Sequence, residues 1–285
     1  MLDALFFAGL VLYFVAMILQ FLGDSFKKDN LKKYAWWVFL AGFACSTLYL
    51  IVRGIKAGRF PMSNQFEFAA TFSFGIALML IILKERVKAD WLVTAAIPMV
   101  FLILSYAAFQ PRGIKELMPA LRSVWFVFHI GTAAFSYAAF ILAGAAGIRY
   151  LYTEKKDKNS PELEDIDFMI YRLIALGLLL LTVTIISGAI WAEQAWSSFW
   201  TWDPKEVWAL ITWLLYSIFL HLRMNRKWKG HRMAVFAIVA VPVVLFTFVG
   251  VNTLMPGLHS YGAVINYYLM YINSSRGLCS EQSGI

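Results

Sequence analysis

Two of the four histidines and a cluster of tryptophans are the residues of this sequence best suited to bind a cofactor. His129 lies near the start of an apolar run, and His259 follows the last long apolar run. A neutral imidazole is a common axial ligand of haem iron. The segment 191–206 contains four tryptophans, whose indole rings offer a large apolar surface to a flat ligand. These residue types together favour a haem site with His129 and His259 as the two axial ligands.

Each of these residues also has an ordinary structural explanation. Tryptophan is enriched where a membrane meets water, and a histidine at the end of a membrane span can hydrogen-bond to the backbone. Asp203 precedes Pro204 and stands three residues before Glu206, a pattern typical of a helix N-cap with a capping box. Both roles of Asp203, cap and ligand contact, therefore stay open. The occurrence of both histidines beside the tryptophan-rich segment favours the haem site.

The remaining histidines and the two cysteines lie in other contexts. His221 falls near the opposite end of a later apolar run, about 30 Å from the first site, so it is either an interface residue or a second, inner ligand. His231 is expected to be a solvated loop residue. Cys45 and Cys279 form neither a CxxC nor a CxxCH motif, so the sequence predicts no redox dithiol and no covalent haem on this chain.

The elements that must position these residues are membrane spans. Of 285 residues, 61% are hydrophobic and 15% charged, whereas soluble domains have roughly 45–50% and 25%. We expect a single polytopic domain over 1–285, an all-α bundle of about eight transmembrane helices without a sizeable soluble domain. Runs long enough to cross a bilayer lie at 2–22, 35–52, 66–83, 91–109, 124–148, 172–190, 207–223 and 233–251.

Basic residues predict which ends of these spans face the cytoplasm. Of the 25 Lys and Arg residues, 17 lie in the connections that follow the odd-numbered spans. Short cytoplasmic loops collect positive charge, so both termini and the segment 191–206 should lie on the outer face. The charged stretch 149–172 is expected to be a solvated hairpin. These loops account for the net charge of +8, and no nucleic-acid partner is expected.

The sequence resembles the cytochrome c assembly family of haem-handling membrane proteins, in particular the CcsA/ResC type of System II cytochrome c biogenesis. The resemblance rests on the tryptophan-rich segment 191–206, the WWD domain, which ends in WDPKE and has His129 and His259 in the flanking positions. Two further matches are FPMSNQFE at 60–67 and GLHSYG at 257–262. The resemblance to the family runs through most of residues 35–262.

The resemblance implies a subunit of a System II cytochrome c synthase that works with a CcsB/ResB-type membrane partner in the lipid bilayer. Haem b would enter from the cytoplasmic side between His221 and a histidine of that partner, then occupy the outer site with His129 and His259 on its iron. Its vinyl groups would be joined to the CxxCH thiols of apocytochrome c, which thiol-reducing proteins keep reduced. The implied haem-binding residues further include Trp191, Trp196, Trp200, Trp202 and Asp203. Haem propionates need cationic or hydrogen-bonding partners, and the outer candidates are Lys205, Arg122, Arg112 and the indole N–H groups.

Two alternatives remain at this point, and one segment has no explanation. A System I, CcmC-like protein would present haem to a chaperone without synthase activity, although eight spans, His221 and GLHSYG favour System II. A structural or transport protein with an aromatic belt would bind no haem. The resemblance predicts a multi-pass protein of the bacterial plasma membrane, with the thylakoid membrane as the other location. The C-terminal extension 263–285 exceeds the family pattern, and we assign it no role.

Overall fold

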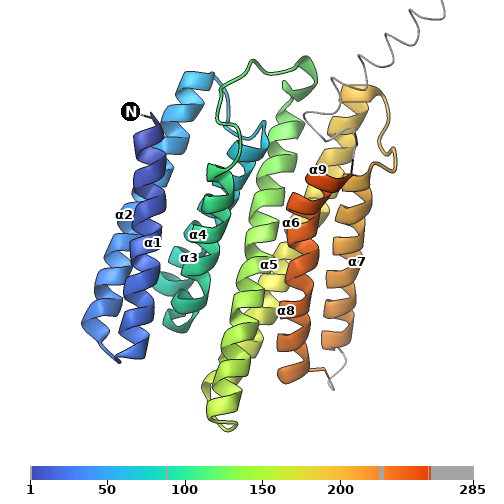
Figure 1. The fold of residues 1–285 in the computed structure, drawn as a ribbon. Helices are drawn as coiled ribbons and strands as arrows, with labels where there is room; N and C mark the ends of the chain where they lie inside the picture. The colour runs from blue at the N-terminus through green and yellow to red at the C-terminus, as the bar shows by residue number, and fades with distance from the viewer. Residues whose placement is uncertain (1, 88, 225–227, 256, 258–285) are drawn as a thin grey trace, which may run out of the picture.

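A computed structural model describes residues 2–87, 89–224, 228–255 and 257. Within these ranges the regular structure is helical, and eight helices are long and apolar enough to cross a membrane (Figure 1). The predicted all-α bundle of eight spans is therefore confirmed. His259 and the extension 263–285 lie outside the described residues.

The helices follow the predicted apolar runs, and most extend beyond them. The last span is continuous over α8, the π-helix η3 and α9. The bounds are α1 Leu2–Ser25, α2 Asp29–Ala57, α3 Gln65–Val87, η1 Asp90–Leu92, α4 Val93–Ala108, η2 Pro119–Leu121, α5 Val124–Lys156, α6 Glu162–Trp196, α7 Pro204–Met224, α8 His231–Leu245, η3 Phe246–Gly250 and α9 Val251–Leu254.

Two connections differ from their predictions in extent. The stretch 149–172 is mostly helix, because α5 runs on to Lys156 and α6 begins at Glu162. The segment 191–206 likewise is a loop only over 197–203. Good helix formers carry α6 through Trp196, and Ser197 ends that helix in the left-handed conformation at φ 58°.

α5 and α6 form the centre of the bundle, with α1 to α4 on one side and α7 and α8 on the other (Figure 1). Small residues on α5 allow its neighbours to approach closely. A Cβ atom at Gly147 would lie 2.7 Å from the carbonyl oxygen of Ala234 on α8. α5 is accordingly the most buried of the eight spans.

Successive spans alternate in direction, so several connections gather at one end of the bundle. The start of α1, the start of α5, the α6–α7 loop and α9 all lie at the upper end in Figure 1. We call this the site end. The charge pattern predicts that it faces away from the cytoplasm, and the prediction of outer termini depends on the same argument.

Candidate functional site

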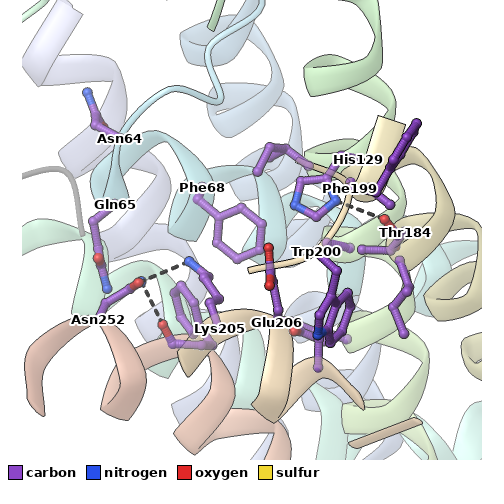
Figure 2. Close-up of a pocket in the computed structure, with 18 residues that line it drawn as sticks. Asn64, Gln65, Phe68, His129, Thr184, Phe199, Trp200, Lys205, Glu206 and Asn252 are labelled. Atoms are coloured by element: carbon purple, nitrogen blue, oxygen red, sulfur yellow. Dashed lines mark hydrogen bonds between the residues drawn. The ribbon is translucent and has the colours of Figure 1, made fainter. Parts of the chain in front are cut away.

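A pocket at the site end lies between α3, α5, α6, α7 and the η3–α9 segment (Figure 2). Its wall is largely apolar and aromatic, and it encloses about 70 Å³. Pockets that hold drug-sized ligands measure roughly 300–1,000 Å³. A porphyrin therefore enters only if side chains or the 197–203 loop shift outward.

His129 of α5 lines this pocket, and its ring orientation is fixed from one side. Its Nδ1 lies 2.9 Å from the carbonyl oxygen of Thr184 on α6. A carbonyl can only accept a hydrogen bond, so Nδ1 carries the proton and Nε2 has the lone pair of the neutral ring. Histidines that ligate metals are commonly oriented by such a bond from the other ring nitrogen. His129 thus has the tautomer that a metal-ligating Nε2 requires.

Two further residues of α6 shape the space around His129. Trp191 stacks on the imidazole, with ring centroids 5.9 Å apart and planes 20° apart. Gly188 lies directly against the ring, since a Cβ atom there would be 2.6 Å from Nδ1. Any larger residue at position 188 would displace the histidine.

The four tryptophans of the 191–206 segment do not form one continuous surface. Trp191 is buried, and its indole N–H donates to the carbonyl of Ala120 at 2.8 Å. Trp196 packs edge-on against Trp191. Trp200 lines the pocket, and Trp202 is 70% exposed and perpendicular to Trp200. Trp191 and Trp196 therefore pack together beside His129, while Trp200 lines the pocket and Trp202 contacts Trp200 from the exposed loop.

Asp203 and Glu206 form the capping box that the sequence predicts. The Asp203 carboxylate accepts the backbone N–H of Lys205 at 2.9 Å, and Glu206 accepts the backbone N–H of Asp203 at 3.2 Å. Glu206 also accepts the backbone N–H of Thr201 at 2.8 Å, which fixes the end of the loop. The cap role of Asp203 is confirmed, and its part in ligand binding stays a prediction.

Of the three outer cations, Lys205 alone is among the described residues that line the pocket. Its Nζ donates to Oδ1 of Asn252 on α9 at 3.0 Å (Figure 2). Arg112 lies 3.9 Å from Asp3 of α1, and Arg122 is exposed on the loop before α5. The sequence did not distinguish these three candidates for binding a propionate, whereas the structure places Lys205 at the pocket and the two arginines elsewhere.

The stretch FPMSNQFE at 60–67 leads into α3, which begins at Gln65, and it borders the pocket. Asn64 and Gln65 line the pocket, and Asn64 caps α3 by accepting the Glu67 N–H at 2.8 Å. Glu67 is fully buried and pairs with Arg53 of α2 and with Arg59, each at 2.8 Å. Glu67 is therefore an internal anchor of α3.

The two other histidines lie at the opposite end of the bundle. His221 is exposed in the last turn of α7. His231 is the first residue of α8, also exposed, with Nδ1 2.6 Å from a carboxylate oxygen of Glu154. The predicted solvent exposure of His231 is confirmed, but the residue begins α8 and does not lie in a loop. The ligand role of His221 stays a prediction.

Sequence reasoning did not single out Thr184, Gly188 or Asn252, which hold His129 and Lys205 in place. They belong to apolar runs, where a lone small or polar residue usually serves helix packing. Nothing in their local sequence distinguishes them, because the residues that they contact lie 47 or more positions away.

Fold and pocket together define a class of protein: a multi-pass helical membrane protein with a histidine and aromatic side chains at one end of its bundle. The profile of the family "Cytochrome C assembly protein" matches residues 62–259. The chain is 36% identical to the cytochrome c biogenesis protein CcsA of Prochlorococcus marinus strain MIT 9301, over 89% of this chain and 92% of the relative. It is 35% identical to CcsA of Synechococcus sp. strain CC9605, over 91% and 96%.

The chain belongs to the cytochrome c assembly protein family and is of the CcsA type. Its fold is similar to that of a solved structure, "Cytochrome c Heme Lyase CcmF", with a TM-score of 0.68 over 98% of this chain and 51% of that chain. The sequence identity there is 14%, so this likeness concerns the fold alone. The resemblance found in the sequence is confirmed, and the chain is a cytochrome c assembly subunit of a plasma or thylakoid membrane.

Proposed function

We propose that this chain is the membrane subunit of a System II cytochrome c synthase. It carries haem b from the cytoplasmic side to the pocket at the site end and presents it to apocytochrome c. The single observation that supports this most is the geometry of His129, whose Nδ1 bonds to Thr184 and whose Nε2 bears the lone pair in an aromatic pocket. That is the arrangement of an axial iron ligand.

The second axial ligand in this proposal is His259. It lies two residues after Gly257, and Gly257 packs against the carboxylate of Asp203. The chain thus passes the start of α7 at the border of the pocket shortly before it reaches His259. Together, His129 and His259 would hold the iron of a bound haem and would keep oxygen from it until the apocytochrome binds.

The reaction joins each thiol of the CxxCH motif to a vinyl group of the haem. The S–H bond breaks, sulfur bonds to the inner vinyl carbon, and the hydrogen goes to the outer vinyl carbon, so no oxidant is consumed. The chain contributes by holding the haem in one orientation, with Trp200 and Phe199 against its plane. Fixing two reactants in place can supply up to roughly 7–11 kcal/mol of the barrier reduction.

At the cytoplasmic end, His221 and a histidine of the CcsB/ResB-type partner would hold the incoming haem. The exposed position of His221 in the last turn of α7 leaves its ring accessible to another subunit. Replacing it by alanine should reduce haem loading of the purified complex, and added imidazole should restore the loading by substituting for the ring. Normal loading without imidazole would contradict the inner site.

The outer site is tested by the absorption spectrum of the detergent-purified chain with its partner. Wild type should show a Soret band, and His129→Ala and His259→Ala should each weaken or shift it. His231→Ala is the control, because His231 is exposed at the other end and bonds to Glu154. A missing band in wild type, or one that neither substitution alters, would refute the proposal.

The reaction product distinguishes the synthase role from a CcmC-like role in which haem passes to a chaperone. Co-expression with the partner and an apocytochrome should yield cytochrome c with covalently bound haem that survives denaturing electrophoresis. Haem that is bound by the chain but never becomes covalent would favour the chaperone role. The eight described helices that are long and apolar enough to cross a membrane support the System II role over the CcmC-like role.

A further inference from the structure

Lys205 places an ammonium group at the pocket next to an uncharged partner. Its Nζ donates to the amide oxygen of Asn252 at 3.0 Å. Among the residues that the structure describes, no carboxylate oxygen lies within 4.0 Å of this nitrogen. Removing a charge from water is costly unless an opposite charge compensates for it. The ammonium group is therefore well placed to gain from an anionic ligand.

The two carboxylates that flank Lys205 closely in the sequence, Asp203 and Glu206, are engaged in shaping the start of α7. Asp203 accepts the backbone N–H of Lys205 and attracts its ammonium group only at longer range. Glu206 lines the pocket but turns toward the loop, where it accepts the N–H groups of Thr201 and Asp203. Neither carboxylate replaces Asn252 as the direct partner of Lys205.

The remainder of the pocket wall is chemically suited to a flat apolar body, once the outward shift of side chains or of the 197–203 loop has widened the pocket. Phe68, Phe199, Trp200 and Phe248 line it, and the described lining residues include no second lysine or arginine. One cation at the border of an aromatic pocket suits a planar ligand that carries a carboxylate on one edge.

We infer that Lys205 is the residue that binds a haem propionate, and that Asn252 holds its ammonium group until the propionate takes the place of the amide oxygen. The inference rests on the proposed function and names the residue that recognises the charged edge of the haem. Binding the propionate at the start of α7 would direct the vinyl-bearing part of the ring away from Lys205. Lys205 is thus a positioning residue for the thioether step.

The test titrates the full chain in detergent with haem and with haem dimethyl ester, whose propionates are uncharged, and obtains both dissociation constants from the Soret band. Wild type should bind the ester about tenfold to a hundredfold more weakly, as expected for one charged hydrogen bond. In Lys205→Met the two ligands should bind alike. The control Lys115→Met, an exposed residue of the α4–α5 connection, should behave as wild type.

A second variant, Asn252→Asp, gives Lys205 a carboxylate of its own. It should weaken haem binding severalfold and leave ester binding unchanged, so retained ester binding shows that the variant is folded. The inference would be overturned if the ratio of the dissociation constants for the ester and for haem were equal in wild type and Lys205→Met. A lipid phosphate bound at Lys205 would give that result. If wild type binds haem through His129 but its ester-to-haem ratio equals that of Lys205→Met, only this inference fails. If wild type binds no haem, the proposed function fails.

Discussion

His129 is held in place by residues of α6 that support its ring. His129 has a defined tautomer because the Thr184 carbonyl accepts its Nδ1 proton, and a defined position because Gly188 leaves room for its ring. Trp191 stacks on the ring, and its own indole N–H is bonded to Ala120. The chemistry of the residue therefore depends on the surface that α6 presents to α5.

Replacing Gly188 by alanine should disturb haem binding without removing a ligand. The added Cβ would lie 2.6 Å from Nδ1 of His129, so the ring must move and its bond to Thr184 must weaken. We expect about a tenfold weaker haem affinity and a shifted Soret maximum, measured by titration in detergent.

Gly131→Ala is the matched control for this change. Gly131 lies on α5 two residues from His129, and a Cβ atom there would meet nothing within 4 Å. Alanine should be neutral or stabilise the helix by roughly 0.5–1 kcal/mol. Equal spectra for Gly188→Ala and wild type would show that the packing of position 188 does not control the ligand.

At the scale of elements, the pocket depends on how α3 is fixed to its neighbours. Glu67 joins α3 to Arg53 of α2, and its Oε2 also accepts the backbone N–H of Ser63 at 2.8 Å. The same turn presents Asn64 and Gln65 to the pocket. A buried ion pair contributes little net stability compared with apolar residues, but breaking one is costly because a charge is left unpaired.

Glu67→Gln should therefore lower the free energy of unfolding by about 3–5 kcal/mol, because Arg53 is buried and would lose its counter-charge. The measurement is the thermal unfolding midpoint in detergent. Glu85→Gln is the control on the same helix: its carboxylate is exposed and 3.9 Å from Lys84, and no measurable change is expected. A midpoint of Glu67→Gln equal to that of the control would contradict the anchoring role.

At the scale of the whole molecule, the bundle separates two ends that the proposed function uses differently. The pocket lies at the first turn of α7, and His221 lies at its last turn. The basic residues concentrate at the His221 end, where the connections after the odd-numbered spans lie. The distribution of basic residues thus predicts that the pocket lies on the outer face.

Reporter insertions test this orientation. A phosphatase that is active only outside the cytoplasm should be active after Ile114, in the α4–α5 connection, and inactive after Lys158, in the α5–α6 turn. The expectation follows from the accumulation of Lys and Arg in cytoplasmic loops. The reverse activities would overturn the topology and with it the proposed direction of haem transport.

The sequence by itself determined the features that depend on local pattern. Apolar runs specify eight spans because an isolated helix is the open-chain element that satisfies its own backbone in lipid. The capping box at Asp203 and Glu206 was equally readable, since its partners are three residues apart. The types of residue that could bind haem, histidine beside tryptophan, were visible as well.

Only the tertiary structure decided which of these residues meet. His129 and Thr184 are 55 positions apart, and Lys205 and Asn252 are 47 apart, so each contact depends on how two helices are rotated and packed against each other. The tryptophans separated into two pairs because Ser197 ends α6 in a left-handed turn between them. Composition places indoles and imidazoles in one chain, but the packing of α6 against α5 and of α7 against α9 determines the site.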